Sequence, residues 1–254
     1  MLNAITRAIS PCIGDCELTY LRRHPIDVEK ATRQQQAYER LLSELGLRLI
    51  SLPAEPEMPD AVFVEDTAVV TAEVAVLTTM GATARRREVE SISEQLAKYR
   101  PLLSINGAGT LDGGDVVRAG RNLFVGLSGR TNADGIDQLR QILKPYDYRI
   151  MPVEVTGCLH LSTGCAFIGR NTVLANCDWV DVSPFAGYDV IDVSTTEPWG
   201  ANALTFGDDV LIAASCPQTA ARVRERGFRV HDVDISELEK AEGGVTCMSI
   251  IFES

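Results

Sequence analysis

The chain has 254 residues, of which 45% are hydrophobic and 23% charged, so it contains ample apolar material for a buried core. These values exclude a disordered tail, a collagen-like repeat and a mini-protein. Lysine and arginine number 24 against 35 aspartates and glutamates, a net charge of −11, and the basic footprint of a protein that binds nucleic acid is therefore missing.

The apolar and cysteine patterns favour a cytoplasmic protein with no membrane partner. No apolar run approaches the roughly 20 residues that span a bilayer. The first residues, MLNAITRAISP, lack the basic start and long apolar stretch of a signal peptide. The seven cysteines are odd in number and scattered, which favours reduced thiols over a disulfide framework.

Short apolar strands alternate with a few amphipathic helices along the chain. The first helix is predicted over 28–46, where Ala31, Tyr38 and Leu42 recur at near-helical spacing and Gly46 ends the pattern. The next predicted elements are a strand over 47–53, two strands over 61–71 and 74–79, a charged surface helix over 85–100 and a strand over 101–107. The same order recurs in a hairpin at 114–126, a helix near 132–144 and strands at 148–155, within 159–177, within 201–216 and at 228–235, with a helix at 217–227.

Similar segments begin near positions 62, 114, 159, 201 and 246, at intervals of roughly 42 to 52 residues, a spacing typical of propellers or arrays. A final strand over 246–252 is predicted to complete the first unit from the other end of the chain. Because no Pro-rich or Ser-rich linker interrupts the units, we predict an α/β fold made of one closed domain, residues 1–254, with pseudo-fivefold symmetry. The alternative from this pattern is an open mixed sheet with helices on both faces.

One cysteine and one histidine are candidates for chemistry. Cys247 follows two glycines at the start of an apolar strand, where the backbone can bend sharply and present a thiol nucleophile. Most cysteines are simply small core residues, and the other six are assigned that role. A base for Cys247 must come from three histidines, and only His160, between leucines at the start of a predicted strand, needs a specific reason for its position. A structural role for His160 stays open at this point.

Two otherwise apolar segments contain carboxylates. The first contains Asp60, Glu65 and Asp66, and the second contains Asp112 and Asp115 on either side of two glycines. Burying such groups costs several kcal/mol unless each one finds a partner. They therefore pair with arginines or hold a cation. The cation is either a metal ion such as Mg²⁺ or Ca²⁺, or a cationic organic substrate, and the second choice also explains a nearby cysteine and histidine.

The sequence resembles a known family in six segments that occur in the same order: MPDAVFVEDTAVV, GATARRRE, GTLDGGDVV, LFVGLSGRTN, LHLSTG and ELEKAEGGVTCMSI. These are similar to segments of the dimethylarginine dimethylaminohydrolases, which belong with arginine deiminases and amidinotransferases to a superfamily of guanidino-group-modifying enzymes. The resemblance runs from about Arg7 to the C-terminus. It implies a five-bladed α/β propeller, the pentein fold, with the active site in its central channel.

The resemblance also implies an activity, the hydrolysis of methylated arginine to citrulline and a methylamine, with no metal or organic cofactor. It makes Cys247 the nucleophile, His160 the general acid and base, and Asp112 the residue that orients His160. The implied substrate contacts are Asp66 for the guanidinium, Glu65 and Asp60 as pocket support, Arg85 and Arg130 for the amino-acid carboxylate, Leu18 on a mobile lid, and the backbone of Ala241 and Glu242 facing the α-amine. The expected partner is a small molecule, and a homodimer and a monomer both remain open.

Ser162 departs from the family pattern. Arginine deiminases and amidinotransferases carry an aspartate there as a second guanidinium clamp, and the dimethylarginine enzymes usually carry lysine. A serine removes the second carboxylate and leaves space for a methylated nitrogen, which favours dimethylarginine as substrate. The alternatives are another guanidine hydrolase such as an arginine deiminase-like enzyme, a carboxylate-bound metal site, and a non-enzymatic propeller that binds a macromolecule.

Overall fold

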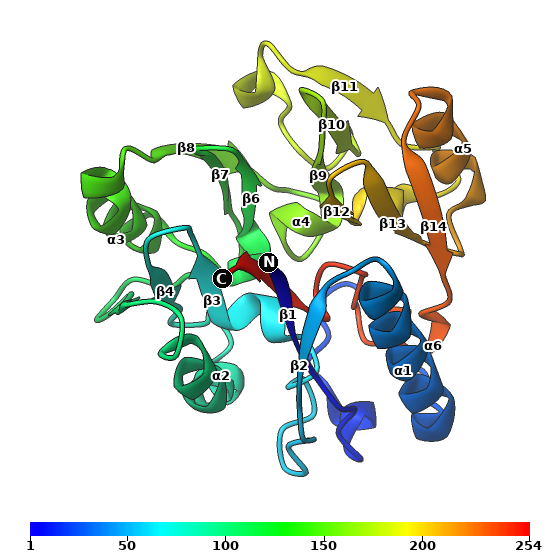
Figure 1. Cartoon of the computed structure of the whole chain (residues 1–254), viewed down its shortest axis with the longest axis horizontal. Helices are drawn as coiled ribbons and strands as arrows, with labels where there is room; N and C mark the ends of the chain where they lie inside the picture. Colours follow the sequence, from blue (N-terminus) through cyan, green and yellow to red (C-terminus); the bar gives the residue numbers. More distant parts are fainter.

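A computed structural model describes residues 1–254 and contains five separate three-stranded sheets, which surround a common axis (Figure 1). In every sheet the middle strand pairs antiparallel with one neighbour and parallel with the other. This topology confirms the predicted fivefold propeller and excludes the open mixed sheet. The sheets are β15-β1-β2 (Ile250–Glu253, Leu2–Arg7, Arg48–Leu52), β3-β4-β5 (Ala68–Val70, Ala75–Leu77, Leu102–Ser104), β6-β7-β8 (Val116–Ala119, Asn122–Leu127, Arg149–Glu154), β9-β10-β11 (Cys165–Gly169, Thr172–Ala175, Asp189–Asp192) and β12-β13-β14 (Ala203–Phe206, Asp209–Ala213, Arg229–Val233).

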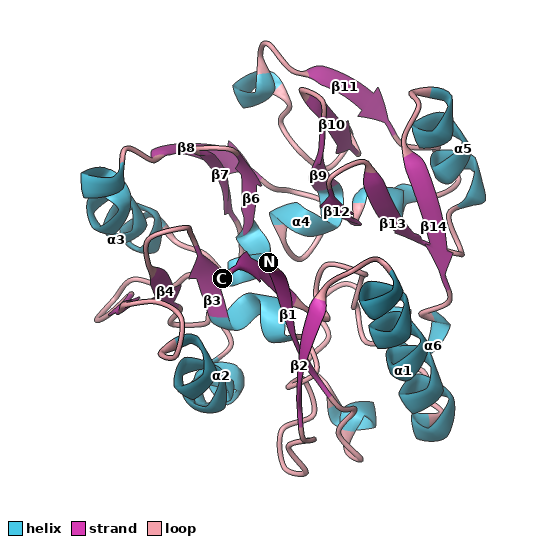
Figure 2. Cartoon of the chain, in the orientation of Figure 1, coloured by secondary structure: helices cyan, strands magenta, loops and turns pink.

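The four longer helices lie on the outside of this ring, as Figure 2 shows. Parallel neighbours need a crossover connection, and in four of the sheets that connection carries a helix. These helices are α1 (Val28–Glu44), α2 (Val89–Leu96), α3 (Ala133–Leu143) and α5 (Pro217–Glu225), and two single-turn helices, α4 (Leu161–Gly164) and α6 (Ser236–Glu239), lie elsewhere. None of the helices has the length and apolarity needed to cross a membrane.

Helix α1 lies on the outside of the ring, and its inner face contacts the turn that carries Cys247. The Asp27 carboxylate caps the helix by accepting the Lys30 backbone N–H at 2.9 Å, and the helix ends just before Gly46, whose φ is +89°. Tyr38 is fully buried on the inner face, and its hydroxyl donates to the Val245 carbonyl oxygen at 3.0 Å. The predicted helix is confirmed, and its packing fixes the backbone two residues before Cys247.

A short helical turn precedes the innermost strand of four sheets. The turns are η2 (Val64–Thr67) before β3, η4 (Gly113–Asp115) before β6, α4 before β9 and η7 (Pro198–Ala201) before β12. The fifth inner strand, β15, follows an irregular turn at 244–249. The inner strands lie around the axis (Figure 1). Hydrogen bonds join polar residues of all five units near these turns, since Thr246 and Ser162 bind Glu65, Asn202 binds Thr246, and His160 binds Asp112.

Three predicted strands are shorter than expected because their first residues form these turns. The segment 61–71 is a strand only from Ala68, since a regular strand would point Glu65 and Asp66 to opposite faces of the sheet. His160 precedes helix α4 and does not begin a strand. Cys247 lies in the turn before β15, and that strand pairs with β1, as predicted for the closing unit.

The predicted surface helix at 85–100 is shorter than expected, and its first residues are partly buried. The segment begins with a 3₁₀ helix, η3 (Thr83–Glu88), and the α-helix starts only at Val89. Arg85 and Glu88 are buried, 4% and 3% exposed, although the sequence pattern placed this charged stretch on the surface. Their burial is explained by the two ion pairs of Arg85, one with Glu88 and one with Asp66.

Candidate active site

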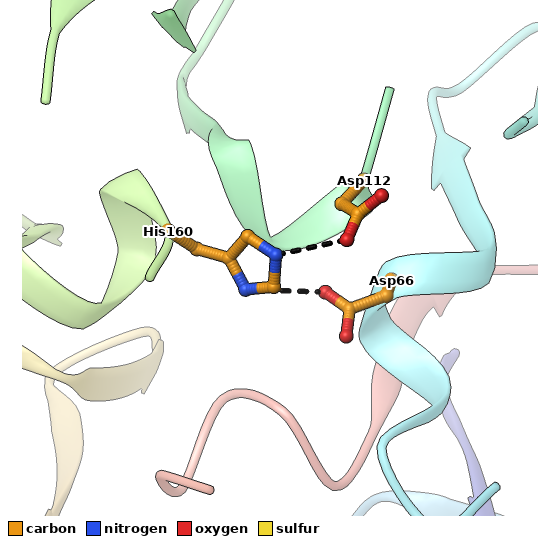
Figure 3. A group of neighbouring side chains, drawn as sticks. All are labelled: Asp66, Asp112 and His160. Atoms are coloured by element: carbon orange, nitrogen blue, oxygen red, sulfur yellow. Dashed lines mark hydrogen bonds and ion pairs between the residues drawn. The ribbon is translucent and has the colours of Figure 1, made fainter. Parts of the chain in front are cut away.

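His160 lies between two buried carboxylates at the end of the channel (Figure 3). Its Nε2 atom is 3.0 Å from Asp112 Oδ2, and its Nδ1 atom is 3.6 Å from Asp66 Oδ1. Burial by itself disfavours the imidazolium, but the negative charges of Asp66 and Asp112 outweigh it and raise the pKa of His160 to about 10. The ring is therefore protonated at neutral pH and can donate a proton.

Two glycines allow these groups to come so close. A Cβ atom on Gly114 would lie 2.7 Å from Asp66 Oδ1 and 2.8 Å from His160 Nδ1, and one on Gly113 would lie 2.0 Å from the Glu65 carbonyl oxygen. The Gly114 backbone N–H donates to Asp66 Oδ1 at 3.2 Å. Any side chain at either position would push η2 and η4 apart, so the pair of glycines is a requirement of the site.

The Cys247 thiol is buried and lines the same cavity as His160 and Asp66. The Gly244 backbone N–H points at Sγ from 3.4 Å. Burial raises the pKa of the Cys247 thiol, and the charges of Glu65 and Asp66 raise it further. The free protein therefore holds a protonated thiol, and a cation placed between Asp66 and Cys247 would favour the thiolate.

The Arg85 guanidinium forms an ion pair with Asp66. Its Nη1 atom donates to Asp66 Oδ2 at 2.6 Å, while Nε and Nη2 donate to the Glu88 carboxylate at 3.1 and 2.9 Å. Burial of Asp66 acts to raise its pKa, but His160 and Arg85 outweigh this effect and lower it, so Asp66 stays ionised. The expectation from the sequence placed Arg85 at the substrate carboxylate, and in the structure its N–H groups already bind carboxylates of the chain itself.

Arg130, the second arginine expected at the substrate, has free bonding capacity. Its Nη1 atom is buried and has no hydrogen-bond partner, and its Nη2 atom donates weakly to Thr19 Oγ1 at 3.4 Å. A buried guanidinium N–H without an acceptor is costly, and an anionic ligand group would satisfy it. Arg130 lines the same cavity as Cys247.

A second polar cluster adjoins Cys247 through Thr246, the preceding residue, and its members are Glu65, Ser162, Asn202 and Thr246. The Thr246 and Ser162 hydroxyls donate to Glu65 Oε2 at 2.8 and 3.3 Å, and the Asn202 amide binds Thr246 Oγ1 at 3.0 Å. Burial and the nearby Asp66 raise the pKa of Glu65 to about 7. The Ser162 hydroxyl is thus directed at Glu65, and Ser162 does not line the cavity beside Cys247.

Sequence reasoning missed three residues of the site: Glu88, Thr246 and Asn202. Glu88 follows Arg85 by three residues, so the spacing of an ion pair within one helical turn was a usable signal. Thr246 is adjacent to Cys247, but its hydroxyl contact with Glu65 joins residues far apart in the chain. No pattern in the sequence indicated Asn202, because its side chain binds Ser162 and Thr246, which belong to other units of the ring.

All but one of the remaining expected residues line the small cavity that contains Cys247, and the exception is Leu18. Asp60, Ala241 and Glu242 line it, and Leu18 packs on the apolar cluster next to Cys247. The other two histidines lie away from it: His24 is exposed, and His231 binds Asp209 at 2.8 Å. All seven cysteines have free thiols.

Asp66, Asp112 and His160 could together offer three ligand atoms to a metal ion, since these atoms lie within 4.8 Å of one another. In this structure the Arg85 guanidinium pairs with Asp66 at 2.6 Å, so any cation that binds Asp66, whether a metal ion or an organic cation, has to displace this ion pair.

Comparisons with known proteins agree with this geometry. The profile of the family described as N,N dimethylarginine dimethylhydrolase, eukaryotic, matches residues 21–253. The N(G),N(G)-dimethylarginine dimethylaminohydrolase of Streptomyces coelicolor is 36% identical over 253 residues, which cover 98% of this chain and 96% of that protein.

Two solved structures share the whole fold. A dimethylarginine dimethylaminohydrolase, a histidine-to-glycine variant in an adduct with S-methyl-L-thiocitrulline, superposes with a TM-score of 0.95 at 33% identity and covers 99% of this chain and 100% of its own. A cysteine-to-serine mutant of the Pseudomonas aeruginosa enzyme, complexed with citrulline, gives a TM-score of 0.94 at 33% identity and covers 98% of both chains. The chain therefore belongs to the dimethylarginine dimethylaminohydrolase family of the pentein superfamily.

Proposed function

We propose that this protein hydrolyses Nω-methylated arginines, namely monomethylarginine and asymmetric dimethylarginine, to citrulline and a methylamine, with Cys247 as nucleophile. The observation that carries the proposal is the position of His160, between Asp112 and Asp66, on the cavity that also contains the Cys247 thiol. Membership of the family supplies the substrate class.

Substrate binding starts the reaction. The substrate guanidinium binds Asp66 and takes the position that Arg85 Nη1 holds in the free protein. The released Arg85 then joins Arg130 at the substrate carboxylate, because Arg130 lines the same cavity and its Nη1 atom has no hydrogen-bond partner. The backbone carbonyls of Ala241 and Glu242 accept the α-ammonium group. The added positive charge beside Cys247 lowers the pKa of the thiol, which loses its proton to solvent.

The Cys247 thiolate then attacks the guanidinium carbon, and a carbon–sulfur bond forms. His160 donates its proton to the methylated nitrogen, the carbon–nitrogen bond breaks, and methylamine or dimethylamine leaves. A covalent S-alkylthiouronium remains on Cys247. Asp112 keeps the ring of His160 in position for this transfer through the 3.0 Å contact with Nε2.

The second half of the reaction uses the same histidine as a base. Neutral His160 removes a proton from water, and the resulting hydroxide adds to the thiouronium carbon. The tetrahedral adduct collapses, the carbon–sulfur bond breaks, and citrulline and the Cys247 thiolate are released. Every proton passes through His160 or solvent, so the reaction needs no metal ion and no organic cofactor.

The decisive experiment compares arginine, monomethylarginine and asymmetric dimethylarginine as substrates in a citrulline assay. The proposal expects turnover of the methylated substrates, none with Cys247→Ser, and no change on adding a chelator. Acid quenching during turnover should add mass to the peptide containing Cys247. Labelling of the buried Cys158 would show that a different thiol reacts, and turnover of arginine alone would favour a deiminase.

The compartment and the assembly belong to the same proposal. We place the protein in the cytoplasm because all seven thiols are free and the net charge is −11. Fractionation of cells that express a tagged chain tests the compartment. Light scattering on the purified protein distinguishes a homodimer from a monomer.

A further inference from the structure

One buried side chain joins the turn that carries Cys247 to the turn that follows His160. The Oδ1 atom of Asn202 accepts the Thr246 backbone N–H at 3.1 Å, and its Nδ2 atom donates to the Ser162 carbonyl oxygen at 2.9 Å. Thr246 directly precedes Cys247, and Ser162 follows His160 by two residues. The Asn202 amide, on a residue that is 6% exposed, therefore binds the main chain of both segments.

The bonding pattern at this position fits an amide of this length. The second N–H of Nδ2 donates to Thr246 Oγ1 at 3.0 Å, so both amide protons of Asn202 are used. An aspartate would offer acceptors but no donor to the Ser162 carbonyl oxygen, and a leucine of similar size would offer neither. Loss of either main-chain bond would leave a buried polar group without its partner, which is costly.

Asn202 is itself held in a fixed position. Its backbone N–H donates to the Trp199 carbonyl oxygen at 3.1 Å, which closes the turn η7. Gly244 lies directly against its side chain, since a Cβ atom on this glycine would be 2.3 Å from Asn202 Cγ. A side chain that is fixed at its backbone and packed in this way can set the position of the groups that it binds.

Glu65 joins the same two segments in a different way. Its Oε2 atom accepts hydrogen bonds from the hydroxyls of Ser162 and Thr246. Such hydroxyls can change rotamer without movement of the main chain, whereas Asn202 binds the backbone groups themselves. Removal of the Asn202 amide would therefore leave the two segments connected through Glu65 but would free their backbones to shift relative to each other.

We propose that Asn202 is a positioning residue that sets the distance between Cys247 and His160 by fixing the backbones of their two turns. Cys247 attacks the guanidinium carbon and His160 donates a proton to a nitrogen on that carbon, so both must reach one small group. A displacement of about 1 Å in such an arrangement lowers the rate by on the order of 100-fold. This inference rests on the proposed function for the reaction, whereas the bridge is a property of the free protein.

Kinetics with a methylated arginine give the first test. Asn202→Ala and Asn202→Asp should each lower kcat by about 10- to 100-fold. KM should stay within about twofold, because Asn202 does not line the cavity that contains Cys247. A merely structural role would lower the amount of folded enzyme, which thermal unfolding measures, without this difference between kcat and KM.

The matched control is Gln34→Ala. Gln34 also carries a buried amide that donates with its nitrogen and accepts with its oxygen, but its partners are Ser236 Oγ and the Glu237 N–H, so it joins α1 to α6. This variant should keep kcat within about twofold of the wild type. An equal fall of kcat in Gln34→Ala would overturn the proposal, since the loss would then follow from general loosening, and so would a wild-type kcat in Asn202→Ala.

Hydrogen exchange on the substrate-free protein tests the bridge directly. In the wild type the Thr246 amide should exchange at least about tenfold more slowly than the amide of Met248, which is buried in the same turn without a hydrogen-bond acceptor. Asn202→Ala should remove this protection of Thr246, and Asn202→Asp, which keeps an acceptor oxygen, should retain it. Equal exchange of the two amides in the wild type would refute the bridge.

The two tests separate this inference from the proposed function. A wild type that releases no citrulline would contradict the proposed function, and the exchange measurement would still decide whether the bridge exists. Should Asn202→Ala fail to fold, Asn202→Asp gives the kinetic comparison, because it is nearly the same size and lacks only the donor to the Ser162 and Thr246 oxygens. A wild-type kcat in Asn202→Asp would overturn the role of Asn202.

Discussion

The substitution Asp112→Asn should lower the pKa of His160 and with it the pH below which His160 carries the proton that it donates. The Asp112 carboxylate contacts His160 Nε2 at 3.0 Å and also accepts the Gly81 N–H at 2.8 Å, so asparagine keeps the shape but loses the charge. A hydrogen bond to a charged group contributes about 1.5–3 kcal/mol, and 1.36 kcal/mol corresponds to one pKa unit. The pKa of His160, raised to about 10 in the wild type, should therefore fall by about 1–2 units.

NMR titration of labelled histidine rings measures this shift directly, because the chain has only three histidines to assign. The alkaline limb of kcat/KM should move down by a similar amount. Asp209→Asn is the matched control, since Asp209 contacts His231, and it should leave the titration of His160 unchanged. If His160 of the Asp112→Asn variant titrates at the wild-type pH, the argument that Asp112 holds its proton is refuted.

The same shift predicts a pH dependence of stability. His160 has a higher pKa when folded than its model-peptide value of 6.5, so it stabilises the native state fully below that value and loses this effect as pH rises through about 10. The difference in unfolding free energy between wild type and Asp112→Asn should be largest in acid and should vanish above pH 10. Urea unfolding across this range tests the sign.

Three further predictions concern the neighbouring residues. Gly114→Ala should lower kcat/KM by roughly 100-fold, because its Cβ atom would separate Asp66 from His160. Gly129→Ala, at an open position, is the control and should leave activity intact. Wild-type activity of Gly114→Ala would refute the argument that Gly114 must lie in contact with Asp66 and His160. Glu65→Gln should reduce the loss of stability as pH rises from 4.5 to about 7, because Glu65 no longer contributes to it; urea unfolding at pH 5 and pH 8 measures this, and an unchanged pH dependence would contradict the raised pKa of Glu65. Ser162→Asp should reduce stability at pH 8 by placing a second carboxylate beside Glu65, and a higher ratio of kcat/KM for arginine over dimethylarginine would show that this position also reaches the guanidinium.

The repeat of five units was predictable because periodic apolar strands and turn residues are local signals. The strands β3, β9 and β15 were predicted too long at their first residues, since the polar side chains there are turned toward the axis by contacts with other units. Gly113, for example, lies against the Glu65 carbonyl oxygen, 48 residues earlier in the chain. Such contacts cannot be derived from periodicity within one segment.

The site was predictable in its residue types and less so in their pairing. Isolated carboxylates in apolar segments indicated Asp66 and Asp112, and the sequence around Cys247 and His160 made these two residues candidates. The family resemblance then assigned their roles. The partner of Asp66 was not predictable, because an arginine in a charged run is usually solvated, and here Arg85 is buried by its pairing with Asp66 and Glu88.

The sheet that joins β1 to β15 has a consequence for folding. Its antiparallel pair connects residues about 250 positions apart, such as Leu2 and Glu253, so its loop-closure entropy is the largest among the five sheets and its contacts are the most non-local. We expect this seam to be the last part of the ring to form and the first to open under denaturant. Because Cys247 lies immediately before β15, an open seam detaches the thiol from His160 while the other four sheets persist. Activity should therefore disappear at lower denaturant concentration than the bulk of the secondary structure.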